Sequence, residues 1–403
     1  MKALFQTLLA GTLGLSACGH SSTMAPGPTT PYEPQWEATT EQMTPPDAAA
    51  IAAGAQTQAK TAPESKPPAK EPEKAPGKRV VILATGGTIA GAGSAGSYGY
   101  RSGEFKVEDL IKAVPNLDKL AQLSGEQVAN IGSQDMNDAV WIKLADRINQ
   151  LLDSKNVDGI VVTHGTDTLE ETAYFLNLVV KSKKPVVLVG SMRPATAVSA
   201  DGPANLYNGV AVAANKDAAG RGVLLVLNDK IQGARDATKM NTTNVETFDS
   251  PNRGPVGLVN TGKVTWLQRA NKKNTTGSEF SVDAGTTLPR VDIIYAHSNM
   301  DSTLINNALE DGAKGIVVAG VGDGNMSKAA LETLARAVKA GVAVVRSSRV
   351  PTGLVLRNNE VNDDQEGFVA SGELNPPKSR VLLQLALMKT HDPGEIQRMF
   401  NEY

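Results

Sequence analysis

Residues 80–88 read Val80-Val81-Ile82-Leu83-Ala84-Thr85-Gly86-Gly87-Thr88, an apolar run of strand length that ends in a turn of glycine and threonine. A second stretch has the same pattern: the apolar run Gly159-Ile160-Val161-Val162-Thr163 is followed by His164-Gly165-Thr166-Asp167. In an open parallel sheet, ligands bind in the crevice beyond the carboxyl ends of the strands. Glycine allows tight turns, and threonine offers a nucleophilic oxygen. Either motif alone is equally consistent with an ordinary strand-to-helix turn, but the pair indicates a functional site.

Strand-length and helix-length segments alternate along the rest of the chain. The apolar runs lack polar alternation, which is typical of strands buried on both faces; they lie at 80–84, 159–163, 185–189, 223–227, 291–295, 315–319 and 342–346. Helical patterns occupy 137–153, 168–180, 202–214, 302–311 and 327–339, and the last 25 residues read as two further helices. This order predicts an α/β fold with a doubly wound, mainly parallel sheet and right-handed crossovers.

Composition also predicts where the domains divide. Residues 275–287 are polar and loop-like, and Pro289 begins a new strand–helix series. We therefore expect a larger N-terminal domain over 79–288 and a smaller C-terminal α/β domain over 289–403.

The first 78 residues do not have the pattern of a folded domain. Residues 1–17 combine a charged start, an apolar stretch and small residues, which is typical of a signal peptide. Leu15-Ser16-Ala17-Cys18 is similar to a bacterial lipobox, so Cys18 is the expected lipidation site; the alternative is an ordinary signal peptide. Residues 18–78 are rich in Pro, Ala, Lys and Glu, and we expect them to form a disordered tether.

Charge and cysteine content exclude several classes of function. The net charge of −2 lacks the basic excess typical of nucleic-acid binding, and a single cysteine allows no intramolecular disulfide. The four histidines form no cluster with metal-ligand spacing, so we expect no metal site.

A threonine nucleophile needs a neighbouring base or an acidic hydroxyl group. Tyr98 and Tyr100 lie in a Gly/Ser/Ala-rich stretch after Thr88, a composition suited to a mobile lid. A lysine beside Thr166 and Asp167 would provide a base. Lys239 is one of 40 Lys and Arg residues, however, and spacing alone does not select it.

The chain resembles the bacterial type II L-asparaginases of the asparaginase/glutaminase family from about Arg79 to Tyr403. The resemblance is carried by ordered motifs at Ala84–Ala90, Gly132–Asn137, Thr163–Thr168, Gly190–Pro194, Ser199–Pro203 and Arg346–Arg349. It implies hydrolysis of L-asparagine to L-aspartate and ammonia through an acyl-enzyme, without a metal or organic cofactor.

The same resemblance assigns a role to individual residues. It implies that Thr88 is the nucleophile and that Tyr100 is its partner on the lid; Tyr98 is the rival, because the loop is shorter than in some relatives. Thr166, Asp167 and Lys239 match a second triad. The residues that match the substrate-binding positions are Ser133, Gln134, Thr166, Asp167, Asn325 and Glu360.

The resemblance further implies that a neighbouring subunit contributes Asn325 and Glu360, so a tetramer of two intimate dimers is expected.

Two alternative functions remain open. A glutaminase-asparaginase would act comparably on L-glutamine, although Gln134 and Asn325 favour the asparagine-preferring members. A solute-binding lipoprotein has little need of the two threonine-bearing turns. With the lipobox, we expect a periplasmic protein anchored by lipid to the outer membrane, with no nucleic-acid partner.

Overall fold

The computed structural model describes residues 77–93, 100–101, 104–269 and 271–403. The predicted signal peptide, Cys18 and nearly all of the predicted tether lie outside these residues, as does Tyr98. Tyr100 is described by its backbone only.

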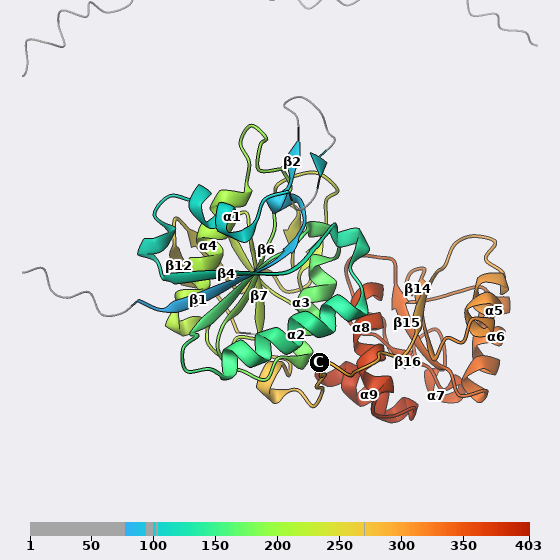
Figure 1. Ribbon diagram of the computed structural model, residues 1–403. Helices are drawn as coiled ribbons and strands as arrows, with labels where there is room; N and C mark the ends of the chain where they lie inside the picture. Colours follow the sequence, from blue (N-terminus) through green and yellow to red (C-terminus); the bar gives the residue numbers. More distant parts are fainter. Residues whose placement is uncertain (1–76, 94–99, 102–103, 270) are drawn as a thin grey trace, which may run out of the picture. The chain divides into compact units, whose positions relative to one another are not determined.

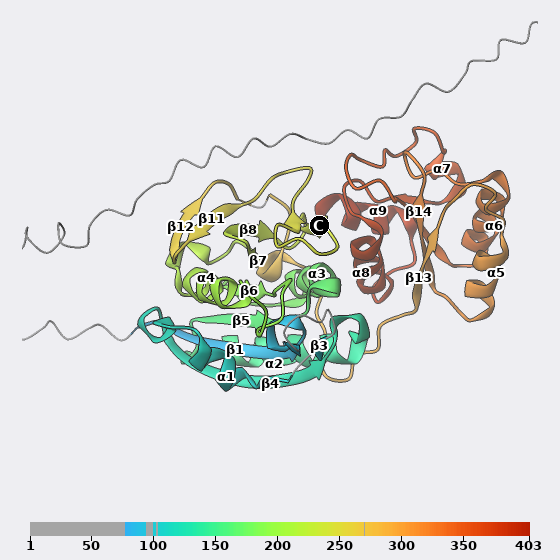
Figure 2. The same cartoon turned by 90° about the horizontal axis from the view of Figure 1, so that it is seen from above.

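The N-terminal part is built on an eight-stranded sheet in the order β12-β11-β8-β7-β6-β5-β1-β4. Figure 2 shows β4, β1, β5, β6, β7 and β8 side by side in that order. The strands are β1 (Arg79–Gly86), β4 (Gln122–Ile131), β5 (Gly159–Thr163), β6 (Val186–Val189), β7 (Val223–Leu227), β8 (Lys230–Gly233), β11 (Gly257–Asn260) and β12 (Lys263–Trp266). The first five are parallel, which confirms the predicted mainly parallel sheet, and the last three add an antiparallel edge that the sequence did not predict.

Alternate residues of β1 enter two different cores, so both faces of the sheet are covered. Val81 and Leu83 pack with helices α2 and α3, whereas Val80 and Ile82 pack with α1 and α4. The helices are α1 (Val107–Ala113), α2 (Asp138–Asp153), α3 (Leu169–Val179) and α4 (Gly202–Ala214). This burial on both faces explains the uninterrupted apolar runs.

The C-terminal part has its own four-stranded parallel sheet, β13-β14-β15-β16 (Figure 1). Its elements are β13 (Val291–Tyr295), α5 (Thr303–Glu310), β14 (Gly315–Gly320), α6 (Lys328–Lys339), β15 (Ala343–Ser348), α7 (Asp363–Glu366), β16 (Val369–Ala370), α8 (Pro376–Leu387) and α9 (Pro393–Glu402). Helices α5 and α6 cover one face. On the other face, α8 contributes Leu382 to the core that also holds Phe175 of α3, so one apolar core spans both sheets.

Sequence signals located the long elements well and the short ones poorly. The side chains of Asn137 and Ser327 cap α2 and α6 at the predicted helix starts, and the side chain of Asp392 caps α9. The patterns missed β4, because polar residues occupy half of this strand and only Val128 is buried along it. They also missed several two-residue strands, β2 (Ala92–Gly93), β3 (Tyr100–Arg101), β9 (Thr238–Lys239) and β10 (Phe248–Asp249).

Candidate active site

Glycine allows the ends of three neighbouring strands to touch. Gly87 has φ +82°, and a Cβ atom there would lie 2.3 Å from the backbone nitrogen of Gly165. A Cβ atom on Gly165 would in turn lie 2.6 Å from Oγ of Ser133. The Gly87 N–H donates to the carbonyl oxygen of Ile131 at 3.1 Å. The turns after β1, β4 and β5 are therefore in direct contact, and only glycine fits where they meet.

Both threonines of the paired motifs lie on these turns and are almost fully buried. Thr88 begins a short 3₁₀ turn after β1 and is 6% exposed. Thr166 begins the equivalent turn after β5 and is 5% exposed. Because β1 and β5 are adjacent parallel strands, the two hydroxyl-bearing turns lie at the same edge of the sheet.

Lys239 reaches this edge from β9, a strand of a separate two-stranded ribbon. Its Nζ donates to Oγ1 of Thr166 at 3.0 Å and lies 2.6 Å from Oδ1 of Asp167. The structure thus brings Lys239 to two adjacent residues that precede it by 73 and 72 positions in the chain. Such a set can hold a hydroxyl group and move a proton to or from it.

Ser133 links the turn after β4 to the turn after β5. Its hydroxyl oxygen accepts from the backbone N–H of Asp167 at 3.1 Å, and its carbonyl oxygen accepts from Oγ1 of Thr168 at 2.7 Å. The neighbouring Gln134 is exposed and bonds to the carboxylate of Asp135 at 3.4 Å. The buried Ser133, which links the two turns, and the exposed amide group of Gln134 therefore lie next to each other at the sheet edge.

A buried chain of hydrogen bonds supports the turn after β5. Nε1 of Trp141 donates to Oγ1 of Thr172 at 2.8 Å, and this hydroxyl lies 2.9 Å from Nε2 of His164. Nδ1 of His164 lies 2.7 Å from the carbonyl oxygen of Gly165. A carbonyl oxygen can only accept, so Nδ1 carries the proton and donates to Gly165, and Nε2 of the neutral ring accepts from the Thr172 hydroxyl. The His-Gly motif was visible in the sequence, but nothing in it identified Trp141 or Thr172 as partners.

Asn325 and Glu360 belong to the C-terminal sheet, on the loops after β14 and β15. The amide of Asn325 donates to the carboxylate of Glu360. Within the described residues, no hydrogen bond or ion pair joins either of them to Ser133, Gln134, Thr166, Asp167 or Lys239. The predicted site residues therefore form two groups in one chain, one at each sheet.

An internal ion pair holds the loops that carry Asn325 and Glu360. The guanidinium group of Arg346 makes two bonds, at 2.6 and 2.7 Å, with the carboxylate of Asp363, and both side chains are fully buried. Arg346 also donates to the carbonyl oxygens of Asp323 and Leu356, one on each loop. A buried, bidentate pair with these further bonds gives both loops a defined position.

A cavity of about 530 Å³ lies next to Asp167 and Lys239. Residues of both sheet-based parts line it, among them Glu170, Ser348 and Asn375. Within the described part of the chain, no group of His, Cys, Asp and Glu side chains has the arrangement of a metal site. The side chains that line the cavity carry hydroxyl, amino, carboxylate and amide groups.

Comparison with known proteins places the chain in a family. The family model "Asparaginase, N-terminal" matches residues 79–272, and the model "Glutaminase/Asparaginase C-terminal domain" matches residues 290–400. The chain belongs to the asparaginase/glutaminase family.

Curated relatives match over most of their length. The chain is 54% identical to "Probable L-asparaginase periplasmic" of Haemophilus influenzae and 54% identical to "L-asparaginase 2" of Escherichia coli, in each case over 80% of this chain and 93% of the relative. It is 50% identical to "Glutaminase-asparaginase" of Pseudomonas fluorescens, over 80% of this chain and 90% of the relative.

The buried state of His164 predicts a defined pH dependence of stability. Burial lowers the pKa of His164 from 6.5 to about 4, although the bond to the Gly165 carbonyl oxygen opposes this effect. Between these two values the unfolded chain binds a proton that the native ring does not bind, so the free energy of unfolding falls as the pH falls. The expected contribution is about 3 kcal/mol between pH 6.5 and pH 4.

Urea unfolding of the wild type and of His164→Gln between pH 4 and pH 7 measures this contribution. The wild type should lose more stability than the variant as the pH falls. His297→Gln, a substitution of an exposed histidine, serves as the control and should follow the wild type. Parallel curves for the wild type and His164→Gln would rule out the buried neutral ring as the cause.

Proposed function

We propose that this chain hydrolyses L-asparagine to L-aspartate and ammonia, with Thr88 as the nucleophile. The observation that carries the proposal is the contact of Lys239 Nζ with Thr166 and Asp167, on a turn that touches the Thr88 turn. The relatives named as L-asparaginases, at 54% identity, support the substrate.

The proposed reaction has two steps. Oγ of Thr88 attacks the side-chain amide carbon, the C–N bond breaks, and the nitrogen leaves as ammonia after it gains a proton. Water then attacks the acyl-enzyme ester, which releases aspartate and restores the threonine hydroxyl. Backbone N–H groups near Thr166 stabilise the oxyanion, and Lys239 moves protons through the Thr166 hydroxyl. Tyr100, or Tyr98 in its place, supplies the hydroxyl group on the lid.

Ser133, Gln134 and Asp167 are the proposed binding residues for the α-carboxylate and α-ammonium groups of the substrate. The contact between the Ser133 hydroxyl and the Asp167 N–H supports this assignment, because it fixes two of the three residues side by side. The carboxylate of Asp167 is 56% exposed, so it is accessible to a substrate ammonium group.

A glutaminase-asparaginase is the second candidate, and a relative with that name is 50% identical to this chain. A binding pocket discriminates against one additional methylene group by only about 1–3 kcal/mol. Gln134 and Asn325 favour asparagine as the preferred substrate. A non-catalytic solute-binding protein does not require the partly buried contact between Thr166 and Lys239.

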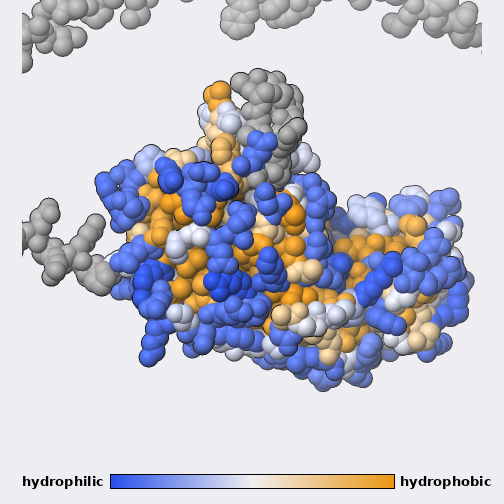
Figure 3. Space-filling model, in the orientation of Figure 1, coloured by the Kyte–Doolittle hydropathy of each residue, from blue (hydrophilic) through white to orange (hydrophobic). Residues whose placement is uncertain are grey.

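We propose that Asn325 and Glu360 complete the active site of a neighbouring subunit in a tetramer of two intimate dimers. Their separation from the Thr166 group within the described chain supports this arrangement. Leu354 and Leu356, on the loop that leads to Glu360, are 56% and 49% exposed. Apolar side chains beside a polar group are typical of surfaces that another subunit covers. Figure 3 shows apolar areas between hydrophilic ones on one face of the molecule.

We propose that the domains divide between residues 288 and 289, a division supported by the end of β12 at Trp266 and the start of β13 at Val291. For location, we propose the periplasm with a lipid anchor at Cys18. The name of the Haemophilus influenzae relative supports the compartment. No helix of the described residues is long and apolar enough to cross a membrane.

Removal of the Thr88 hydroxyl tests the reaction. Thr88→Ala should lower kcat for asparagine by at least about 1,000-fold, because the covalent step is lost. Thr88→Ser keeps a hydroxyl group and should retain measurable activity. Ammonia release from asparagine and from glutamine, measured with the purified protein, gives both kcat and the substrate preference. Thr88→Ala with more than about a tenth of the wild-type activity would exclude Thr88 as the nucleophile.

Subunit mixing tests whether Glu360 acts on a neighbouring chain. Thr88→Ala and Glu360→Ala should each have little activity alone, but a mixed dimer contains one site with both residues intact. Random pairing makes about half of the dimers mixed, so about a quarter of the wild-type activity should return. The ammonia assay is made on the whole co-expressed sample, and two different tags confirm that mixed oligomers have formed. Mixed oligomers without recovered activity would place Glu360 in the site of its own chain.

Substitution of Cys18 tests the anchor. The wild type should fractionate with membranes and carry a lipid mass shift, whereas Cys18→Ser should lose both properties, because its side chain cannot form the thioether. Membrane fractionation and mass spectrometry of the mature protein make the measurement. A wild-type protein that is found in the soluble periplasmic fraction without added mass would contradict the anchor.

A further inference from the structure

Glu170 is a buried carboxylate one helical turn from Asp167, and its interactions converge on Lys239. It lies in the first turn of α3 and is 6% exposed. One of its oxygens, Oε2, accepts from the backbone N–H of Lys239 at 2.6 Å and from Oγ1 of Thr238 at 2.6 Å. The other, Oε1, accepts from Nδ2 of Asn375 at 2.7 Å. Three donors from two distant segments therefore surround one carboxylate.

The amide of Asn375 cannot turn to accept a bond from residue 170. Its Oδ1 accepts from the backbone N–H of Lys378 and caps α8. Its Nδ2 therefore faces Glu170 and also donates to Oγ1 of Thr238 at 3.2 Å. Only a side chain with two acceptor oxygens satisfies Asn375 and the Lys239 N–H together.

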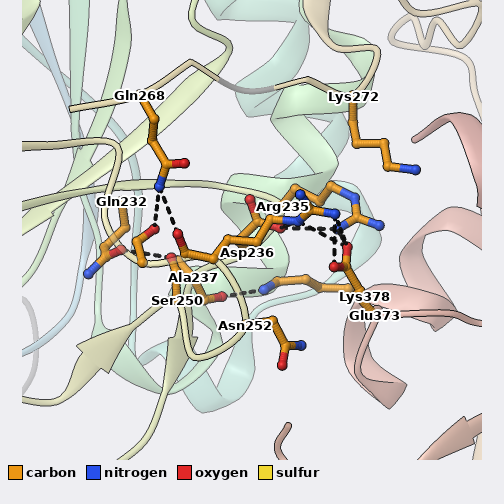
Figure 4. A network of polar contacts seen from close by, with 12 residues as sticks. Gln232, Arg235, Asp236, Ala237, Ser250, Asn252, Gln268, Lys272, Glu373 and Lys378 are labelled. Atoms are coloured by element: carbon orange, nitrogen blue, oxygen red, sulfur yellow. Dashed lines mark hydrogen bonds and ion pairs between the residues drawn. The ribbon is translucent and has the colours of Figure 1, made fainter. Parts of the chain in front are cut away.

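Further bonds tie residues 235–239, which we call the lysine-bearing segment, to the C-terminal part of the same chain. The guanidinium group of Arg235 lies 2.8 Å from the carboxylate of Glu373 and donates to the carbonyl oxygen of Tyr403 at 2.7 Å. Nζ of Lys378 donates to the carbonyl oxygen of Ala237. Figure 4 shows Lys378 and Glu373 directed at this segment.

Lys378 is also a fully enclosed cation near Glu170. Burial lowers its pKa, and the nearby carboxylates of Glu170 and Asp236 oppose that effect. The negative charge of Glu170 thus stabilises the buried ammonium group whose Nζ bonds to the lysine-bearing segment. Glu170 acts on this segment through direct hydrogen bonds and through the charge that it provides for Lys378.

We propose that Glu170 is a positioning residue for Lys239, and that through Asn375 it makes the geometry of the Thr166–Asp167–Lys239 set depend on the C-terminal part of the same chain. This inference rests on the proposed catalytic role of Lys239. A two-residue strand such as β9 has little pairing of its own, so side-chain contacts determine its position. A displacement of about 1 Å at a reacting group can lower a rate by about 100-fold.

Glu170→Gln is the substitution that tests the proposal. Glutamine keeps the shape of the side chain but offers one acceptor oxygen, so either Lys239 N–H or Asn375 loses its bond. We expect kcat for asparagine to fall at least tenfold with KM within about twofold, since Lys239 is displaced while the turn that carries Asp167 keeps its bond to Ser133. Glu171→Gln is the matched control. Glu171 neighbours Glu170 on α3 and lines the same cavity, but among the described residues it makes no hydrogen bond to the lysine-bearing segment.

A double-mutant cycle separates positioning from a general structural effect. If Glu170 acts through Lys239, Glu170→Gln should change the residual rate of Lys239→Met by less than about twofold. Thermal unfolding of the four proteins shows whether each is folded. The inference is supported by a loss of kcat in the wild-type background that disappears in the Lys239→Met background.

Three results would overturn it, and they are distinguishable. An equal loss in both backgrounds means that Glu170 acts independently of Lys239. A wild-type rate in Glu170→Gln, with a low rate in Lys239→Met, means that Lys239 is catalytic but needs no support from Glu170. A Lys239→Met protein with more than about a tenth of the wild-type activity means that the proposed role of Lys239 itself is wrong.

Discussion

The contact between the backbones of Gly87 and Gly165 is the constraint on which the candidate site depends. A side chain at Gly87 would lie 2.3 Å from the next turn, so the approach is possible only without a Cβ atom. The positive φ of Gly87 lets the chain turn at the end of β1 and continue into the Thr88 turn. The two threonine-bearing turns meet for this reason, and the Ser133 turn closes against the same position. The parallel sheet provides the alignment, but the glycines allow the contact.

Periodicity predicted the main sheet strands well because those strands are buried on both faces. Val, Ile and Leu form the uninterrupted apolar runs of β1, β5 and β7, so composition alone identified them. β4 pairs with β1, as β5 does, but half of its residues are polar, and no local pattern predicted it. The antiparallel edge was also missed, since short strands form by pairing with a neighbour and carry little signal of their own.

The candidate site was predictable only in part, because local sequence patterns identify strand ends but not the residues that tertiary structure brings to them. Thr88 and Thr166 follow strong strand patterns, so their place at the sheet edge follows from the sequence. Lys239 lies on a two-residue strand far along the chain, and only the resemblance to a known family selected it. Glu170 carried even less signal, because a glutamate in the first turn of a helix is ordinary; its role depends on donors that tertiary structure brings to it.

The C-terminal part then serves two purposes that use different faces of its fold. Through α8 and the residues before it, it shares a core with α3 and bonds to the segment that carries Lys239. Through the loops held by Arg346 and Asp363, it presents Asn325 and Glu360 on the surface. If those loops complete the site of a second chain, each active site depends on the C-terminal parts of two chains. The C-terminal part of its own chain bonds to the segment that carries Lys239, and that of the second chain contributes Asn325 and Glu360. Displacement of either part would then impair the reaction without any change at Thr88.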